Sequence, residues 1–278
     1  MAIPSIVITG ASSGIGLACA LHFDKLGYQV FAGIRREQDR DALQKMASSR
    51  LQPLMLEVTD EAMIHAAATT VSEKVGEAGL AGLVNNAGVA VAGPLECLPL
   101  SELRRQFEVN VIGQMAVTQA FLPLLRQGPG RIINIGSISG LIAMPFIGPY
   151  SASKYAMEAL NDSLRVELRP WGIHVAIVEP WAIATPIWEK SIDRNQQILE
   201  SLPSTAQTLY RPTLLKLLKN VQRTSRAASP VEWVVLAVSH ALTSPQPRNR
   251  YLVGRDARAA LWFIRFIPDG LRDWLISR

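Results

Sequence analysis

The sequence predicts an α/β fold in which helices cover both faces of a doubly wound parallel sheet. Apolar runs typical of buried strands alternate with helical patterns, without a break, from Ile3 to Val178. This alternation favours parallel strands joined by helices. The chain has 278 residues, 49% of them hydrophobic, and no internal repeat or linker divides it. We therefore expect a single domain over residues 1–278, in which the stretches 186–229 and 257–278 lie outside the alternation.

The composition argues against several classes of protein. The two cysteines, Cys19 and Cys97, are far apart and form no C-x-x-C pair, which indicates a reducing compartment. The four histidines are scattered, so no metal site is expected. The sequence contains no signal-peptide pattern and no run of eighteen apolar residues, and we expect a cytoplasmic protein. The net charge of +5 is spread over the chain and aromatic residues are few, which favours an anionic cofactor or a membrane surface over nucleic acid.

The first expected strand, Ile3 to Thr9, leads into a glycine-rich turn and then into a helix that reaches Leu26. Such a turn lets the backbone approach a pyrophosphate, and the helix N-terminus offers free N–H groups and the positive end of its dipole. The spacing is G-x-x-x-G-x-G, which differs from the commoner G-x-G-x-x-G pattern, and a glycine-rich turn can also be plain structure. The strand before it and the helix after it favour a nucleotide phosphate site, made of Gly10, Ser12, Ser13, Gly14, Ile15 and Gly16.

The end of the second expected strand, Tyr28 to Ile34, decides between two cofactors. An acidic residue there accepts hydrogen bonds from the adenosine ribose, whereas arginine suits a 2′-phosphate. Here Ile34 is followed by Arg35 and Arg36, which predicts NADP(H) rather than NAD. The alternative is that the two arginines only begin a solvated helix with mixed charges.

Two more strands follow, Leu51 to Val58 and Leu80 to Val84, and Asp60 is the expected N-cap of the helix between them. The second of these strands leads into Asn85-Asn86-Ala87-Gly88. Small and amide residues at a strand end suit a backbone packed against a flat ring, although a β-turn would explain them nearly as well.

A long helix is expected from Ser101 to Arg126, and Asn110 lies in its middle between apolar neighbours. Asparagine is an indifferent helix former. We therefore expect Asn110 to have a polar partner.

The fifth expected strand, Arg131 to Gly136, ends at Ser137, whose hydroxyl would emerge at the edge where open α/β sheets bind ligands. Tyr150 and Lys154 stand at i and i+4 on the next helix, which ends at Arg169 before the sixth strand, Gly172 to Val178. A tyrosine titrates near ~10, and a lysine one turn away favours the phenolate and lowers that pKa. The arrangement predicts proton exchange with an alcohol or ketone oxygen held by Ser137.

Together these motifs resemble those of the tyrosine-dependent short-chain dehydrogenases/reductases. The motifs are Thr9-Gly10 with Gly14 and Gly16, Asn85 to Gly88, Asn110, Ser137, and Tyr150 with Lys154. The resemblance covers Ile3 to Thr185 and, more loosely, Tyr251 to Asp256, and it implies a Rossmann-like sheet and hydride transfer between a nicotinamide and a carbonyl or alcohol carbon. It implies that Tyr150 is the acid/base, that Ser137 orients the substrate oxygen, and that Lys154 holds the nicotinamide ribose and lowers the Tyr150 pKa. Asn110, through its backbone or a water it fixes, would link Lys154 to solvent as a proton relay.

The same resemblance implies further cofactor-binding positions and shows two departures. The positions are Glu57, Val58, Asn86, Ala87, Gly88, Pro180, Ile183 and Thr185. Glu57 stands where the family usually has an aspartate that meets the adenine. Pro180-Trp181 stands where the family usually has Pro-Gly, and we expect Trp181 to narrow the substrate mouth.

Two stretches leave alternatives open. In the substrate-lid region, 186–229, Leu214, Leu217, Leu218 and Val221 recur at helical spacing among lysines and arginines. They predict either a lid helix over the substrate pocket or a basic amphipathic surface that touches membrane. The C-terminal amphipathic tail, 257–278, is rich in aromatic residues and could close the pocket, pack on a partner subunit or rest on lipid. We expect it to pack on protein, because Pro268-Asp269-Gly270 breaks it into short pieces.

The sequence therefore predicts an NADP(H)-dependent oxidoreductase for a hydrophobic alcohol, ketone or aldehyde. In overall character it most resembles hydroxysteroid- and retinol-type members of the family, and we expect a homo-oligomer, either a dimer or a tetramer. One alternative is a catalytically silent nucleotide-binding scaffold or redox sensor, which has no need of Ser137, Tyr150, Lys154 and Asn110 together. Another is a lipid-binding peripheral membrane protein, which leaves the cofactor site unexplained.

Overall fold

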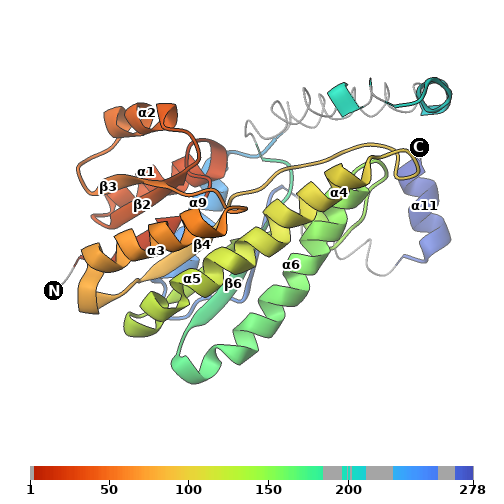
Figure 1. Cartoon of the computed structure of the whole chain (residues 1–278). Helices are drawn as coiled ribbons and strands as arrows, with labels where there is room; N and C mark the ends of the chain where they lie inside the picture. Colours follow the sequence, from red (N-terminus) through yellow and green to blue (C-terminus); the bar gives the residue numbers. More distant parts are fainter. Residues whose placement is uncertain are drawn as a thin grey trace.

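A seven-stranded parallel sheet forms the centre of the molecule (Figure 1). The computed structural model describes residues 3–183, 196–198, 200, 202–210, 228–255 and 267–277. The strands are β1 (Ser5–Ile8), β2 (Gln29–Ile34), β3 (Leu51–Met55), β4 (Gly82–Asn85), β5 (Arg131–Ile135), β6 (His174–Pro180) and β7 (Arg250–Val253). Their order is β3-β2-β1-β4-β5-β6-β7, and all neighbours pair in parallel. The direction of winding therefore reverses between β1 and β4.

Helices cover both faces of this sheet. One face packs against α1 (Gly14–Lys25), α2 (Gln38–Met46) and α9 (Val231–Thr243). The other face packs against α3 (Glu61–Val75), α5 (Gly113–Gln127) and α6 (Gly148–Glu167). α4 (Leu100–Phe107) precedes α5, and α11 (Asp269–Ser277) is the last described helix. Single short turns, η1 (Gly76–Ala78), η3 (Ile138–Gly140) and η4 (Arg169–Trp171), lie between these elements.

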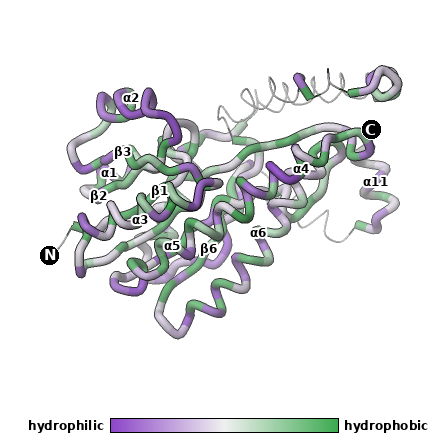
Figure 2. The backbone as a smooth tube through the Cα atoms, in the orientation of Figure 1, coloured by the Kyte–Doolittle hydropathy of each residue, from purple (hydrophilic) through white to green (hydrophobic). Residues whose placement is uncertain are grey.

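The period of two along each strand divides the apolar residues between the two layers. Ile6 and Ile8 of β1 belong to the core beneath α1 and α9, whereas Val7 belongs to the core beneath α3 and α5. All three side chains are fully buried. Strands buried on both faces are the reason the sequence shows continuous apolar runs, and Figure 2 shows that α2, by contrast, is largely hydrophilic.

Most of the expected elements are present within a few residues of their expected bounds. Asp60 is the N-cap of α3, as expected, and its Oδ1 accepts a hydrogen bond from the Met63 backbone N–H at 2.9 Å. β6 begins two residues later than expected and extends to Pro180, and α6 ends at Glu167 rather than Arg169.

The long helix expected from Ser101 to Arg126 is not continuous. It is divided into α4 and α5 by a π-helical segment, η2 (Glu108–Ile112), which contains Asn110. Gly113 N–H bonds to the carbonyl of Glu108, five residues back. Helical periodicity in a sequence cannot distinguish four-residue from five-residue hydrogen bonding over a single turn, and such π segments are frequent at functional sites.

Several expectations fall partly or wholly outside the described residues. These are Thr185, the apolar and basic residues between 211 and 227 of the lid region, and residues 257–266 of the tail. No helix within the described part of the chain is long and apolar enough to cross a membrane.

Candidate active site

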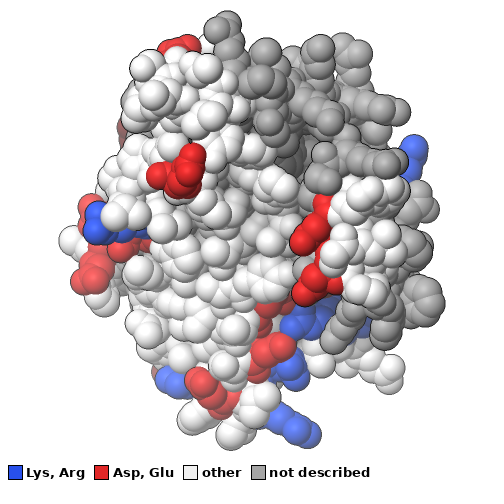
Figure 3. Space-filling view, turned by 90° about the vertical axis from the view of Figure 1, so that its right-hand side faces the viewer, with Lys and Arg blue, Asp and Glu red and all other residues white. Residues whose placement is uncertain are grey.

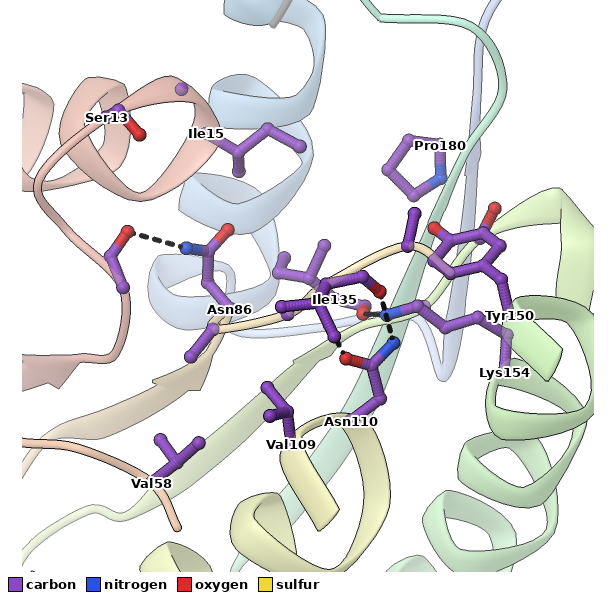
Figure 4. A pocket seen from close by; sticks show the side chains of 18 of the residues that line it. Ser13, Ile15, Val58, Asn86, Val109, Asn110, Ile135, Tyr150, Lys154 and Pro180 are labelled. Carbon is purple, nitrogen blue, oxygen red and sulfur yellow. Dashed lines mark hydrogen bonds between the residues drawn. The ribbon is translucent and has the colours of Figure 1, made fainter. Parts of the chain in front are cut away.

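A cavity of about 350 Å³ opens at the carboxyl ends of the strands, beside the point where the winding reverses. Open α/β sheets bind ligands at this place. Its lining runs from the first turn of α1 to the first turns of α6 (Figure 4). The sequence-predicted residues that line it are Gly10, Ser12, Ser13, Gly14, Ile15, Arg35, Glu57, Val58, Asn86, Ala87, Gly88, Asn110, Ser137, Tyr150, Lys154, Pro180 and Ile183. Trp181 also lines it, next to Pro180.

Among the expected cofactor-binding residues that the structure describes, two do not line the cavity. Gly16 instead packs against Gly10, and an added Cβ would stand 2.4 Å from the Gly10 carbonyl oxygen. Arg36 is turned toward α2, and its Nη2 lies 3.0 Å from Asp39 Oδ1. Of the two adjacent arginines, only Arg35 therefore faces the cavity.

The glycine turn is shaped as a close cradle for a ligand. Gly10 and Gly14 have φ values of +64° and +58°, in the left-handed region that favours glycine. An added Cβ at Gly10 would stand 2.9 Å from the Ala87 Cα. The first turn of α1 carries no acidic side chain, so its N–H groups and dipole are free of a carboxylate that would repel phosphate. These features fit the pyrophosphate of a dinucleotide.

Side-chain hydrogen bonds join the ends of β1 and β4 under this turn. Thr9 Oγ1 accepts from the backbone N–H groups of Asn86 and Ala87, each at 2.9 Å. In return, Asn86 Nδ2 donates to the carbonyls of Thr9 and Gly10 at 2.9 and 3.1 Å. The strand end that carries Asn86, Ala87 and Gly88 is thus held against the glycine turn, and its backbone forms the cavity wall.

At the end of β2, Arg35 is paired with the carboxylate that departs from the family pattern. Arg35 Nη1 lies 3.6 Å from Glu57 Oε2, and the arginine side chain is 63% exposed. Glu57 Oε1 also accepts from the Thr59 backbone N–H at 3.3 Å. Because the pair is exposed, its attraction is weak, and the guanidinium keeps donors available for another anion.

Ser137, Tyr150 and Lys154 line the cavity where α6 begins. Figure 4 shows Tyr150 and Lys154 on adjacent turns of this helix, away from the glycine turn. The Ser137 side chain hydrogen-bonds to the Tyr150 hydroxyl and accepts from the Ser139 backbone N–H at 3.1 Å. Lys154 Nζ donates to the Ile135 carbonyl at 2.7 Å and lies 5.8 Å from the centroid of the Tyr150 ring. The helical i, i+4 spacing and the strand end at Ser137 produce this convergence.

The pKa of Tyr150 is raised in the structure, whereas the spacing to Lys154 predicted that it would be lowered. Burial raises the pKa of Tyr150 above its ordinary value, and the hydrogen bond with Ser137 acts in the opposite direction. Burial also lowers the pKa of Lys154 to about 8. The lysine ammonium bonds to a backbone carbonyl rather than to the phenol. Desolvation is therefore the largest influence on the Tyr150 pKa, ahead of the hydrogen bond with Ser137.

Asn110 has the polar partners that its place among apolar residues required. Its Oδ1 accepts from the Val89 N–H at 2.8 Å, and its Nδ2 donates to the Val89 carbonyl at 3.0 Å and to Ser153 Oγ at 3.3 Å. The side chain thus fixes the segment after β4 against α6. The Oδ1 and Nδ2 atoms of Asn110 are thus both used in hydrogen bonds within the protein. The proton relay from Lys154 to solvent, through the Asn110 backbone or a water it fixes, stays a prediction.

Gln106 is a positioning residue that the sequence reasoning missed. It lies one turn before Asn110, its Oε1 accepts from Val91 N–H at 2.7 Å, and its Nε2 donates to the Val89 carbonyl at 2.9 Å. Gln106 and Asn110 are four residues apart and therefore share a helix face. This second amide at helical spacing was the signal in the sequence, and both side chains are buried in the structure. The further lining residues that were not anticipated are Leu56, Val89, Ala90, Arg105, Val109, Ile135 and Gly136.

Known proteins resemble this chain over most of its length. Residues 4–196 match the family model described as short chain dehydrogenase. Retinol dehydrogenase 5 of Mus musculus is 40% identical, over 98% of this chain and 89% of its own length. An NADPH-dependent 3-dehydrocapnine reductase of Ornithobacterium rhinotracheale is 35% identical, over 96% of this chain and 94% of its own. The crystal structure of a short chain dehydrogenase/reductase from Burkholderia phymatum in complex with NAD is 26% identical, with a TM-score of 0.80, over 95% of this chain and 93% of that one. The chain therefore belongs to the short-chain dehydrogenase/reductase family, oxidoreductases that act on CH–OH groups.

Proposed function

We propose that this chain is an NADP(H)-dependent oxidoreductase that transfers a hydride between the nicotinamide and a hydrophobic alcohol, ketone or aldehyde. One observation carries the proposal: Ser137, Tyr150 and Lys154 lie at one end of a cavity whose other end is the glycine turn. This arrangement suits an extended dinucleotide whose pyrophosphate lies at the glycine turn and whose nicotinamide ring lies beside Tyr150 and Lys154.

Different residues along the cavity would bind different parts of the cofactor and the substrate. The glycine turn and the N-terminus of α1 would hold the pyrophosphate, and the backbone of Asn86, Ala87 and Gly88 would pack against the ligand. The bound cofactor supplies or accepts the hydride. Ser137 would donate a hydrogen bond to the substrate oxygen, while Tyr150 gives the proton to that oxygen in reduction and removes it in oxidation. The Lys154 ammonium would bind the ribose hydroxyls.

Apolar residues near the site favour a hydrophobic substrate. Val91, Leu98 and Ile198 form a small buried cluster, which joins the loop after β4 to the lid region. The relative named retinol dehydrogenase supports a substrate of this class, a large apolar alcohol or its carbonyl.

Residues 202–210 of the lid region are attached to the loops beside this cluster. Tyr210 donates a hydrogen bond to Glu96 at 2.7 Å, and its ring meets Phe146 edge-on with 5.9 Å between the ring centroids. Phe146 has a φ of +66°, which a bulky residue rarely adopts. We propose that this contact closes the apolar end of the cavity over the substrate.

Turnover assays test the proposed function. The purified protein is incubated with NADPH and retinal, steroid ketones and aliphatic ketones, and NADPH absorbance is followed. Oxidation of NADPH with an apolar carbonyl, and little with short polar ones, is the expected result. NADPH binding without turnover across the panel would instead favour the catalytically silent scaffold.

The preference for NADP(H) is tested at Arg35. Arg35→Ala is expected to weaken NADPH binding by about the 1.5–3 kcal/mol of a hydrogen bond to a charged group and to leave NADH nearly unaffected. The reason is that Arg35 faces the cavity with unused donors, and the relative named NADPH-dependent supports the same preference. Dissociation constants for both cofactors are measured by fluorescence titration.

Arg36→Ala is the matched control, because Arg36 is adjacent, carries the same charge and bonds to Asp39 instead. It is expected to leave both dissociation constants unchanged. Equal losses of NADPH and NADH affinity in the Arg35 variant would show that this arginine has a structural role and does not select between the two cofactors.

The C-terminal tail, 257–278, could contact either a membrane or a partner subunit, and an experiment can distinguish the two. In the described part of α11, Leu271 and Trp274 are about half exposed on the single chain, and Figure 3 shows a broad area without charged side chains on the side where α11 lies in Figure 1. We propose that the tail packs on a partner subunit of a homo-oligomer.

Removal of residues 257–278 is therefore expected to reduce the mass measured by light scattering to that of a monomer, with no binding to anionic liposomes before or after truncation. Salt-sensitive liposome binding by the intact chain that is lost on truncation would contradict this proposal. It would favour a membrane-resting tail.

A further inference from the structure

A buried acid lies one helical turn behind Lys154 and has no part in the chemistry described above. Tyr150, Lys154 and Glu158 stand at successive i+4 positions of α6 and therefore share one face of the helix. Glu158 is only 8% exposed. Arg250 Nη1 donates to its Oε2, and its carboxyl group also interacts with that of Glu179. No N–H or O–H donor of the described residues reaches its buried Oε1. A buried carboxylate with an unused oxygen is costly and calls for an explanation.

The described charged groups that face Glu158 come from three elements: Lys154 and Asp162 from α6, Glu179 from β6, and Arg250 from β7. Arg250 Nη1 also donates to Glu179 Oε1 at 2.9 Å, and its Nη2 donates to Asp162 Oδ2 at 2.8 Å. Three carboxylates thus share one guanidinium. Asp162 is also paired with Arg165 at 2.9 Å, whereas Glu158 and Glu179 both bond to Arg250 Nη1. One guanidinium is thus divided between two buried carboxyl groups, so the charge of Glu158 is incompletely balanced once its proton is lost.

The loop that carries Ser137 rests directly on this turn of α6. An added Cβ at Gly136 would stand 3.3 Å from Glu158 Oε1. At Gly140 it would stand 2.9 Å from the Lys154 carbonyl oxygen and 3.1 Å from Glu158 Cγ. The two glycines on either side of Ser137 therefore let the loop approach Lys154 and Glu158 closely. Glu158 therefore packs directly against the loop and the helical turn that carry Ser137 and Lys154.

The protonation of the two side chains is linked. Burial lowers the pKa of Lys154 to about 8, and the Glu158 carboxylate acts against that lowering. Burial, followed by the charge of Glu179, raises the pKa of Glu158 to about 7, against the pull of Arg250. An acid is charged above its pKa, so Glu158 is negative in the pH range where Lys154 would otherwise begin to lose its proton.

We propose that Glu158 is a positioning residue that acts through Lys154: its carboxylate keeps the ammonium charged and thereby sets the upper pH limit of the acid–base chemistry. This inference rests on the proposed function for its consequence in turnover. Its physical content, the charge state of Lys154, is measurable without any substrate.

The direct test is an NMR titration of the full-length chain labelled at lysine ¹³Cε, with the Lys154 resonance assigned by its loss in Lys154→Arg. In Glu158→Gln the midpoint of the Lys154 titration is expected to fall by about one pH unit, because the carboxylate one helical turn away, which opposes the lowering of the Lys154 pKa, is removed. Asp162→Asn is the matched control: it removes the same charge from the same arginine, one turn farther from Lys154. It is expected to move the midpoint little.

An unchanged midpoint in Glu158→Gln, or an equal shift in Asp162→Asn, would overturn the proposal. If Glu158→Gln fails to fold, the wild-type titration decides by itself. A second, smaller inflection of the Lys154 resonance, as Glu158 takes up its proton, supports the proposal, and its absence overturns it.

Retinal reduction with NADPH, followed against pH, adds the functional readout: the alkaline decline of kcat is expected to move to lower pH by the same amount in Glu158→Gln. A chain that shows the NMR shift but turns over no carbonyl would contradict the proposed function and leave the role of Glu158 standing.

Discussion

Replacing Tyr150 by phenylalanine is expected to reduce turnover by at least the ~10²–10⁴-fold that general acid–base catalysis supplies. The substitution keeps the ring and its packing but removes the hydroxyl that bonds to Ser137. The other tyrosine of α6, Tyr155, stands on another face of the helix and is 44% exposed. Turnover of an apolar ketone with NADPH, at saturating concentrations of both, measures the effect.

Cofactor binding provides the check that the loss is chemical. The NADPH dissociation constant of Tyr150→Phe is expected to stay close to that of the wild type, because the glycine turn and Arg35 lie at the far end of the cavity. Tyr155→Phe removes a hydroxyl from the same helix and is expected to retain full turnover. A Tyr150→Phe enzyme with most of its activity would exclude this tyrosine as the proton donor.

Replacing Gly16 by alanine is expected to have the largest effect on cofactor binding. An alanine inside a helix normally stabilises it relative to glycine by ~0.5–1 kcal/mol. Here the added Cβ would stand 2.4 Å from the Gly10 carbonyl oxygen and 2.5 Å from Asn86 Nδ2, neither of which can move without opening the joint between β1 and β4. We expect the free energy of unfolding to fall by ~1–3 kcal/mol, as for other overpacked sites.

The same displacement moves the turn that would hold the pyrophosphate, so NADPH affinity is expected to fall at least tenfold. Denaturant unfolding and fluorescence titration measure the two effects. Gly270→Ala is the control: this glycine lies in α11, and no described residue beyond its own helix comes within 4 Å of the added Cβ. The change is expected to leave both quantities intact or slightly raise stability. A Gly16→Ala chain as stable as the wild type, with unchanged NADPH binding, would contradict the packing argument.

The sequence by itself determined the sheet and the approximate place of the acid–base pair. Both depend on short-range rules that a chain displays directly. Strands buried on both faces appear as apolar runs, a glycine turn joins a strand to a helix, and Tyr150 and Lys154 share a helix face because they are four residues apart. The polar partners of Asn110 were predictable for the same reason, since a buried amide must be satisfied.

The tertiary structure alone decided which of two adjacent arginines faces the cavity and in which direction the Tyr150 pKa moves. Arg35 and Arg36 are equivalent in the sequence, and only the placement of Asp39 and Glu57 separates them. The Tyr150 pKa is raised above all by burial, to which elements far apart in the sequence contribute. The Glu158–Arg250 pair joins residues 92 positions apart. Periodicity describes what a helix or strand places on its own faces, whereas burial and long-range charge pairing exist only once the elements are packed together.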